Sequence, residues 1–236
     1  MQRRDRDRGS KEDPPAVSVS RSYFTTGVSA LFEMSTADAN RILPAHLPPI
    51  EVRPQRSILN VTAFHFRDTR VGPYAELVFS VVVPPMVTGW SQHPKAGFFP
   101  FVAATSSRES QALLRDEFRL PVHPDPIDAR FVEREDSIRI QIWSGGDPVV
   151  DMVVTKHEWH TSTHLLHSFM VDGDQRFKAD IRISGSYTMH EHERGSLALS
   201  PHPITEDLSL SEVSASPFRE HWLKEGSQTF HPLEVM

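Results

Sequence analysis

Short strand-like segments separated by turns occupy most of this sequence. Residues 57–67 and 137–143 alternate polar residues with β-branched, aromatic or other apolar ones, and the apolar run 75–83 suits a buried strand. Turn residues such as Gly145-Gly146 interrupt these segments about every eight to twelve residues, a spacing typical of β sandwiches and barrels. We therefore expect a mostly-β fold, an antiparallel β-barrel or sandwich with a few short helices.

Two short helices are predicted from the signals at their ends. Ser35 precedes the first helical segment, and Pro44 follows it. Ser106 stands three residues before Glu109, which is the spacing of a capping box, and Pro121 follows that segment. A proline cannot continue a helix. Each helix is therefore expected to begin at its serine and to end before its proline.

The first 16 residues differ in character from the rest. Residues 1–16 are charged, mixed in sign and almost free of large apolar side chains. Such a segment cannot bury enough surface to offset the entropy of ordering it. We expect a disordered tail followed by a single domain over residues 17–236. Because acidic residues dilute its arginines, the tail is not expected to be a nucleic-acid-binding arm.

Composition narrows the function classes. The chain has 236 residues, a formal net charge of −6 and no cysteine. Without a long basic block, nucleic acid is not an expected partner, and disulfides, thiolate metal sites and a cysteine nucleophile are excluded. No apolar run reaches the roughly 20 residues of a membrane helix, and the N-terminal residues lack the apolar core of a secretory signal. We expect no membrane partner and a cytoplasmic location.

Four short motifs occur in a characteristic order. They are Leu-Pro-x-x-Leu at 43–47, Gly-Pro-Tyr-x-Glu-Leu at 72–77, a helix closed by Leu-Pro at 120–121, and Gly-x-Leu-x-Leu followed by His-Pro at 195–203. In this order they resemble the acetoacetate decarboxylase superfamily, and the resemblance covers residues 17–236. It implies that family's β-barrel-like core around a central cavity, and assembly into homo-oligomers.

The residues after the central Leu-Pro step depart from the family. Two consecutive lysines stand there in the family, and the first forms a Schiff base with the substrate ketone. Here these positions hold Val122 and His123. An imine needs a primary amine, which neither side chain supplies. Lys95 and Lys156 are candidates for a relocated amine, although the usual state of a lysine is solvated.

Three polar residues are the main candidates for the cavity. The resemblance matches Glu76 to a cavity glutamate and Arg21 to an arginine that holds a substrate carboxylate, and it puts Thr62 where a second glutamate stands. A desolvated carboxyl group at this position would have a raised pKa, which suits proton transfer near neutral pH, whereas pairing with Arg21 would leave its pKa at the ordinary value. The alternatives are an outward-facing glutamate and a surface arginine. The expected substrate-binding residues are Thr62, Phe64, Phe66, Phe101 and Val122.

His123 takes the place of the second lysine. An imidazole titrates near pH 6.5, so it is suited to act as an acid or a base. The alternative is a turn histidine between prolines that faces solvent. His65 stands between two phenylalanines and is expected to serve in packing.

The run of histidines at 157, 160, 164 and 167 suggests a metal site. On a helix these four side chains would share one face, and neutral imidazoles are common zinc ligands. The surrounding Thr and Ser residues favour a strand instead, on which His164 and His167 point to opposite faces. We therefore assign no metal ligand, and the metal site stays an alternative.

Together these residues predict an enzyme of the acetoacetate decarboxylase-like superfamily that acts without a Schiff base or a cofactor. The substrate would carry a carbonyl and a carboxylate group, and Glu76, His123 and Arg21 would catalyse proton transfer, cyclisation, dehydration or hydrolysis. Because such relatives often belong to secondary-metabolite pathways, the resemblance implies a biosynthetic role. We expect an enzyme of the lyase, isomerase or cyclase type. The alternatives are a non-catalytic small-molecule-binding protein and a metal-dependent enzyme that uses the His157–His167 run.

Overall fold

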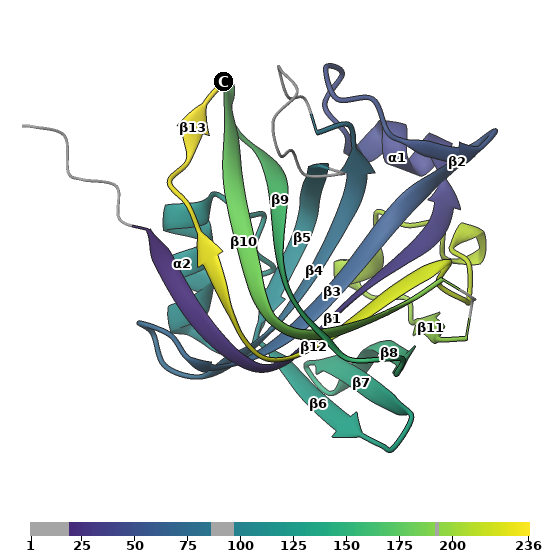
Figure 1. Ribbon diagram of the computed structural model, residues 1–236. Helices are drawn as coiled ribbons and strands as arrows, with labels where there is room; N and C mark the ends of the chain where they lie inside the picture. Colours follow the sequence, from purple (N-terminus) through teal and green to yellow (C-terminus); the bar gives the residue numbers. More distant parts are fainter. Residues whose placement is uncertain (1–18, 86–96, 192–193) are drawn as a thin grey trace, which may run out of the picture.

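The structure is a computed structural model that describes residues 19–85, 97–191 and 194–236. The tail 1–16 and Lys95 lie outside these residues. The described chain is built mainly from strands, with short helices at their edges (Figure 1). None of the described helices is long and apolar enough to span a membrane.

One sheet closes on itself to form a barrel (Figure 1). Its strands are β1 (Ser20–Ser35), β3 (Arg56–Asp68), β4 (Tyr74–Val83), β5 (Gly97–Thr105), β9 (His160–Asp172), β10 (Gln175–His190) and β12 (Arg219–Phe230). Neighbours follow the order β1-β12-β10-β9-β5-β4-β3, and β3 pairs with β1 to complete the ring. Two short strands extend it, β2 (Glu51–Arg53) on β3 and β13 (Glu234–Val235) on β10. The expected mostly-β barrel is confirmed.

A second, smaller sheet lies beside the barrel. It contains β6 (Ile127–Glu133), β7 (Ser137–Ser144), β8 (Asp147–Thr155) and β11 (Ser196–Leu199), in the order β11-β8-β7-β6. The helical segments are α1 (Thr36–Ile42), α2 (Arg108–Phe118), η1 (Pro203–Thr205) and η2 (Leu210–Glu212). All pairings within this sheet are antiparallel.

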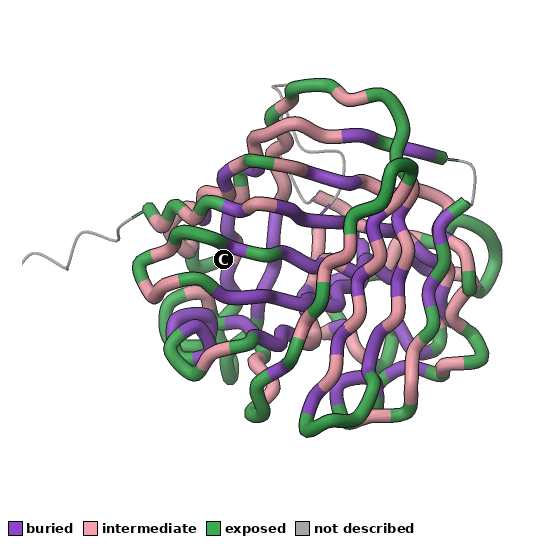
Figure 2. Tube along the Cα trace, turned by 90° about the horizontal axis from the view of Figure 1, so that it is seen from below, coloured by how far each residue is buried: buried purple, intermediate pink, exposed green. Residues whose placement is uncertain are grey.

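Side chains of the barrel strands alternate between two faces. Val28, Leu59 and Leu77 belong to one large core cluster with Ile138 and Ile140 of the second sheet. A sheet that packs on a closed barrel must lie outside it, so this is the outer face. The alternation of buried and less buried positions is visible along the strands in Figure 2. Residues of the opposite parity face the barrel interior, called the lumen below.

Helix α2 closes one end of the lumen. Leu114 of the helix and Leu120 after it pack against Val78, Ala103 and Met170, which face inward from β4, β5 and β9. Apolar contact of this kind anchors a short helix that could not be stable alone. This group of buried residues is called the α2 cluster below, and it consists of Val78, Ala103, Leu114, Leu120, Met170, Phe177, Ala179 and Phe230.

Both helices begin at a serine, and the second begins one residue later than expected. Ser35 caps α1, as predicted. The N-cap of α2 is Ser107, whose Oγ accepts a hydrogen bond from Ser110 N at 3.1 Å. The Oγ of Ser106 accepts instead from Ala75 N, at 2.8 Å. The prediction of Ser106 as the cap is therefore wrong by one residue, because this serine ties the helix start to β4.

Candidate functional site

Glu76 lies on the lumen side of β4, two residues from Tyr74 and two from Val78, which face the same way. In the antiparallel ladders it stands opposite Phe64 of β3 and Thr105 of β5. Only 6% of the residue is exposed. The barrel wall thus places a carboxyl group in a nearly dry interior.

The carboxyl group of Glu76 has one polar partner among the described residues, the hydroxyl of Tyr74. Tyr74 Oη donates to Glu76 Oε2 across 3.4 Å, and no described ion pair includes Glu76. Burial raises the pKa of Glu76 to about 7, and the hydrogen bond from Tyr74 opposes only part of that rise. Burial and the adjacent Glu76 raise the pKa of Tyr74 as well, so the phenol stays protonated. Glu76 can therefore gain or lose a proton near neutral pH.

Aromatic rings supply the apolar surroundings of Glu76. The ring centroids of Phe24 and Phe64 are 5.2 Å apart, those of Phe64 and Phe66 5.5 Å, and those of Phe66 and Tyr74 5.0 Å. Gly27 makes this packing feasible, since a Cβ at that position would lie 2.2 Å from Cε1 of Phe64. The structure thus brings Phe64 and Phe66 together with Glu76.

A row of polar side chains crosses the lumen wall beside Glu76. Thr62 of β3 pairs with Ser29 of β1, which in turn pairs with His221 of β12. Ser29 Oγ donates to Asn60 Oδ1 across 2.9 Å. Thr62 is therefore part of the same wall as Glu76, on the neighbouring strand.

His164, His221 and Tyr187 form a second polar group on the lumen side. The two imidazole centroids are 6.2 Å apart with the rings nearly parallel, and the ring of His164 lies 4.7 Å from that of Tyr187. Burial and the neighbouring His164 lower the pKa of His221 to about 4, and burial lowers that of His164. The sequence analysis did not identify His221 or Tyr187 as site residues. The pattern His221-Trp222-Leu223 is typical of a strand, in which His221 and Leu223 share the face opposite the buried Trp222.

Arg21 lies outside this site. It is exposed near the start of β1, and its guanidinium carbon stands 5.5 Å from the centroid of the Tyr23 ring. The expectation that Arg21 shares the cavity with Glu76 is contradicted. A guanidinium needs a buried partner to leave water, and at the open end of β1 it keeps its hydration and a ring contact instead.

Val122 and His123 follow α2 and face opposite sides of the wall. Ala103 N donates to Pro121 O at 2.9 Å and His123 N donates to Ala103 O at 2.8 Å, so this segment adds to β5 as a short parallel bridge. Val122 packs on the α2 cluster in the lumen. The ring of His123 lies instead 5.8 Å from that of His202, and burial lowers its pKa. The expectation that His123 joins Glu76 is therefore contradicted by the alternation of side chains.

Phe101 lines a hollow at the seam between β5 and β9. This seam hollow has a volume of about 630 Å³. The Phe101 ring also contacts Phe79 on the outer face, with centroids 6.2 Å apart. Phe101 is thus separated from Phe64 and Phe66, contrary to the expectation of one shared wall. The β4–β5 pairing shifts register between Phe79 and Ser80. Residues of β5 on the two sides of this shift therefore do not follow one continuous alternation of faces.

The histidine run is divided by the strand that carries it. β9 begins at His160, and His164 faces the lumen, whereas His167 faces the other way. His167 Nδ1 lies 3.0 Å from Pro85 O, and its Nε2 lies 3.3 Å from Asp180 Oδ1. Within the described ranges no three His, Asp or Glu side chains gather as a metal site would require. The expected opposite orientation of His164 and His167 is confirmed.

The remaining candidates lie away from Glu76. Lys156 is exposed immediately after β8, and Lys95 is outside the described residues. His65 is exposed and its ring stacks on that of Phe131, with centroids 5.8 Å apart. The expected packing role of His65 is confirmed.

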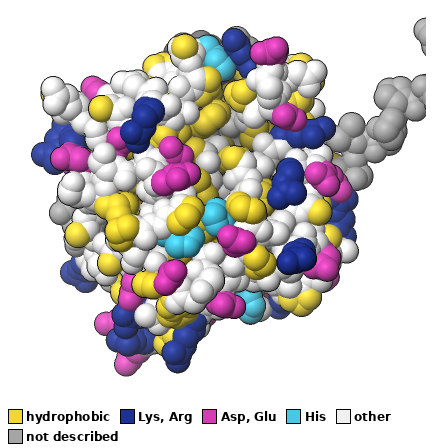
Figure 3. All heavy atoms as spheres, turned by 180° about the vertical axis from the view of Figure 1, so that it is seen from behind, with side chains coloured by type: hydrophobic (Ala, Val, Ile, Leu, Met, Phe, Trp, Pro, Cys, Tyr) yellow, Lys and Arg dark blue, Asp and Glu magenta, His cyan; other side chains and the backbone are white. Residues whose placement is uncertain are grey.

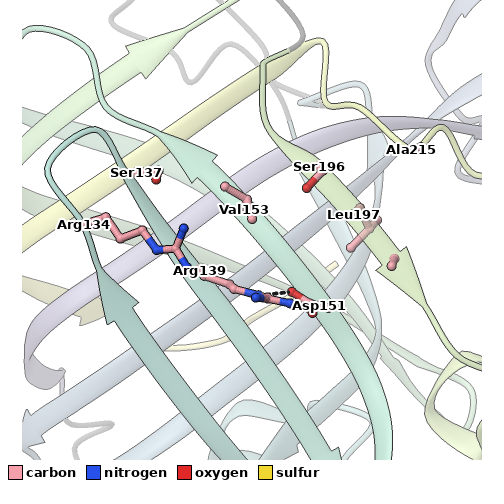
Figure 4. Close-up of a pocket in the computed structure, with 9 residues that line it drawn as sticks. Arg134, Ser137, Arg139, Asp151, Val153, Ser196, Leu197 and Ala215 are labelled. Atoms are coloured by element: carbon pink, nitrogen blue, oxygen red, sulfur yellow. Dashed lines mark hydrogen bonds and ion pairs between the residues drawn. The ribbon is translucent and has the colours of Figure 1, made fainter.

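A smaller hollow lies on the second sheet, with a volume of about 330 Å³ (Figure 4). Arg139 on β7 reaches Asp151 on β8, and their closest N and O atoms are 2.5 Å apart. The back of the molecule mixes basic, acidic and hydrophobic side chains, without a broad field of one charge (Figure 3). Neither feature adds a chemical group to the lumen.

No protein-family model and no curated protein sequence matches this chain. Solved structures do match it. Acetoacetate decarboxylase from Legionella pneumophila is similar with a TM-score of 0.66 at 14% identity, over 97% of this chain and 93% of the other. The enduracididine biosynthesis enzyme MppR, complexed with the condensation product of pyruvate and imidazole 4-carboxaldehyde, has a TM-score of 0.63 at 12% identity, over 96% and 92%. An acetoacetate decarboxylase-like enzyme from Sphingomonas wittichii has a TM-score of 0.58 at 13% identity, over 97% and 99%.

These matches extend over nearly the whole chain, while the identities are low. They agree with the order of motifs along the sequence and with the closed barrel that surrounds Glu76. The chain therefore has the acetoacetate decarboxylase-like fold.

Proposed function

We propose that this chain is an enzyme that transfers a proton at a carbon next to a ketone, with Glu76 as its acid-base group. The supporting observation is a carboxyl group buried in the lumen, without an ion-pair partner among the described residues and with a pKa raised to about 7. Such a group is partly ionised and partly protonated near neutral pH, so one side chain can both accept and return a proton.

In the proposed step the Glu76 carboxylate takes a proton from the carbon beside the ketone. The electrons of the broken C–H bond form the C=C bond of an enolate, and the negative charge moves to the former ketone oxygen. The neutral carboxylic acid then returns its proton to the same or another carbon, which gives exchange or isomerisation. If a hydroxyl group stands one carbon further along, its departure as hydroxide, protonated by the same acid, gives dehydration.

Two observations favour an aromatic or apolar 2-oxo acid as the substrate. Phe64 stands opposite Glu76 in the β3–β4 ladder and its ring packs with those of Phe24 and Phe66, and apolar walls bind apolar substrate groups. One similar structure, MppR, was solved with pyruvate, a 2-oxo acid. With Val122 in place of an amine, the reaction proceeds without an imine. A tailoring step in secondary-metabolite biosynthesis fits this chemistry.

The test is hydrogen–deuterium exchange at C3 of 2-oxo-4-phenylbutanoate in D₂O, followed by NMR. The wild-type protein is expected to accelerate exchange, and Glu76→Gln to lose at least about 100-fold of that acceleration, since general acid-base catalysis contributes roughly 10² to 10⁴. Glu220→Gln is the matched control. Glu220 is also buried with a raised pKa, but it lies on the outer side and accepts a hydrogen bond from Thr155 N at 3.2 Å.

A second candidate function is ligand binding without turnover. It is favoured by the replacement of the family's lysines with Val122 and His123, which removes the known nucleophile while the barrel is kept. Binding of 2-oxo-4-phenylbutanoate with no accelerated exchange in the wild-type protein would support this candidate and contradict the first. Equal exchange rates in the wild-type and Glu76→Gln proteins would remove Glu76 from the mechanism.

A further inference from the structure

The barrel wall is interrupted where β5 and β9 separate. Among the described residues, these two parallel strands pair through Gly97 with His167 and Phe98 with Ser168. Beyond these pairs, residues 99–101 of β5 and 170–172 of β9 border the seam hollow. Its volume of about 630 Å³ is within the range of small-molecule sites, roughly 300 to 1,000 Å³. The hollow is therefore a gap in the hydrogen-bonded wall and large enough for a small ligand.

The seam hollow touches both faces of the wall. Phe99 and Phe101 pack on the outer core, whereas Leu120 and Met170 belong to the α2 cluster in the lumen. A ligand in the hollow thus contacts side chains that also face the interior.

A continuous set of short apolar side chains leads inward from the hollow. Val122 follows Pro121 of the lining and bridges to Ala103. Ala103 in turn pairs with Val78, and Glu76 is the next lumen-facing residue of β4. Between the hollow and the carboxyl group the wall is therefore bordered by small aliphatic groups, among them Val122, where the resemblance places the lysine of the family.

The lining of the hollow combines an apolar floor with a charged rim. Its floor consists of Phe99, Pro100, Phe101, Leu120, Pro121 and Met170. The rim carries three arginines and three aspartates. Their formal charges cancel, so the rim does not favour ligands of one sign of charge. Two of the arginines are engaged, Arg41 with Asp38 at 3.1 Å and Arg119 with Asp172 at 3.5 Å. Aromatic rings and prolines offer apolar contact area to a ligand that carries no charge.

We propose that the seam hollow is the entrance through which an aromatic carbonyl compound passes into the lumen. The inward destination at Glu76 rests on the proposed function, while the entrance itself rests on the gap between β5 and β9. An entrance lowers the barrier to binding and release alike, whereas a binding site changes the affinity. The two roles are therefore separable by kinetics.

A reversible cross-link across the rim tests this directly. The chain has no cysteine, so Arg115→Cys on α2 and Val171→Cys on β9 introduce the only thiols, both at exposed lining positions. A short bifunctional methanethiosulfonate joins them, and a reductant releases them. Binding of 2-oxo-4-phenylbutanoate is measured by NMR line shape. The cross-link is expected to lower the association and dissociation rates at least tenfold together, to leave Kd within twofold, and to be reversed by reductant.

Each single-cysteine variant, carrying a monofunctional methanethiosulfonate, controls for the chemistry and is expected to retain the wild-type rates. Unchanged rates in the cross-linked protein, or wild-type protein that does not bind this ligand, would overturn the entrance. A raised Kd at unchanged association rate would also overturn it and would make the hollow a binding site. If the ligand binds through the seam but no exchange follows at C3, the entrance stands and the proposed function falls.

Discussion

Phe64 and Glu76 stand directly opposite each other in the β3–β4 ladder, on the lumen side of the barrel. On its other flank the same ring covers Gly27 of β1. The Phe64 ring therefore lies between Gly27, which has no side chain to collide with it, and the Glu76 carboxyl group, which it shields from water. The raised pKa of Glu76 is a consequence of this arrangement, because burial is its largest cause.

The Phe64→Leu variant should lower the pKa of Glu76 from about 7 toward its ordinary value of 4.5, since a smaller side chain admits water to the carboxyl group. The measurement is the ¹³C chemical shift of the Glu76 carboxyl carbon as a function of pH. Phe79→Leu is the matched control. It removes the same side-chain volume from the outer face of β4 and should leave the titration of Glu76 unchanged. Equal titration midpoints in wild-type and Phe64→Leu protein would contradict the shielding role.

Glu76→Gln should remove a pH dependence of stability. A group whose pKa is higher in the folded than in the unfolded state contributes stability that is complete below the unfolded value and is lost as the pH rises through the folded one. For Glu76 this window runs from 4.5 to about 7. By linkage the loss is about 3 kcal/mol. Urea unfolding between pH 4 and 8 should show this decline in the wild-type protein and a flatter profile in the variant.

His221 should produce the opposite slope. Its folded-state pKa is lowered from 6.5 to about 4, so the unfolded chain binds the proton more readily and stability is lost as the pH falls through this window. The charged and titratable groups that act on this ring are His164, Arg219 and Glu191. His221→Gln is expected to reduce the acid-induced loss between pH 6.5 and 4 in urea unfolding, with His65→Gln on the exposed outer side as control. A steeper loss in His221→Gln would contradict the lowered pKa.

Gly27→Ala should destabilise the barrel through Phe64. The added Cβ would lie 2.2 Å from the ring, and overpacking of this kind costs roughly 1 to 3 kcal/mol. In a Phe64→Leu background the same change should cost clearly less, because the colliding ring atoms are gone. A double-mutant cycle from urea unfolding measures this coupling. Additive effects of the two changes would show that the ring can move away at no cost.

Alternation and turn spacing were sufficient to predict the barrel, because strands with one face in a core must keep a period of two. The same rule placed Thr62, Phe64 and Phe66 on one side of β3, where the structure has them. It could not place Arg21 or Phe101. Arg21 lies at the exposed start of its strand, and a register shift next to Phe101 breaks the alternation. His123 was misplaced because the bridge to β5, which turns Val122 inward, is formed by backbone atoms.

The proposed absence of imine chemistry leads to the last prediction. Val122 faces the lumen where an amine would be needed, and Lys156 is exposed at the end of β8. Borohydride added to the protein with 2-oxo-4-phenylbutanoate should therefore leave the intact mass unchanged, because no lysine among the described residues is expected to form an imine in the lumen. Val122→Lys supplies the positive control: burial next to the α2 cluster should lower the pKa of the new amine and allow it to form a trapped adduct. A trapped adduct on Lys95 or Lys156 of the wild-type protein would mean that a displaced amine reaches the substrate.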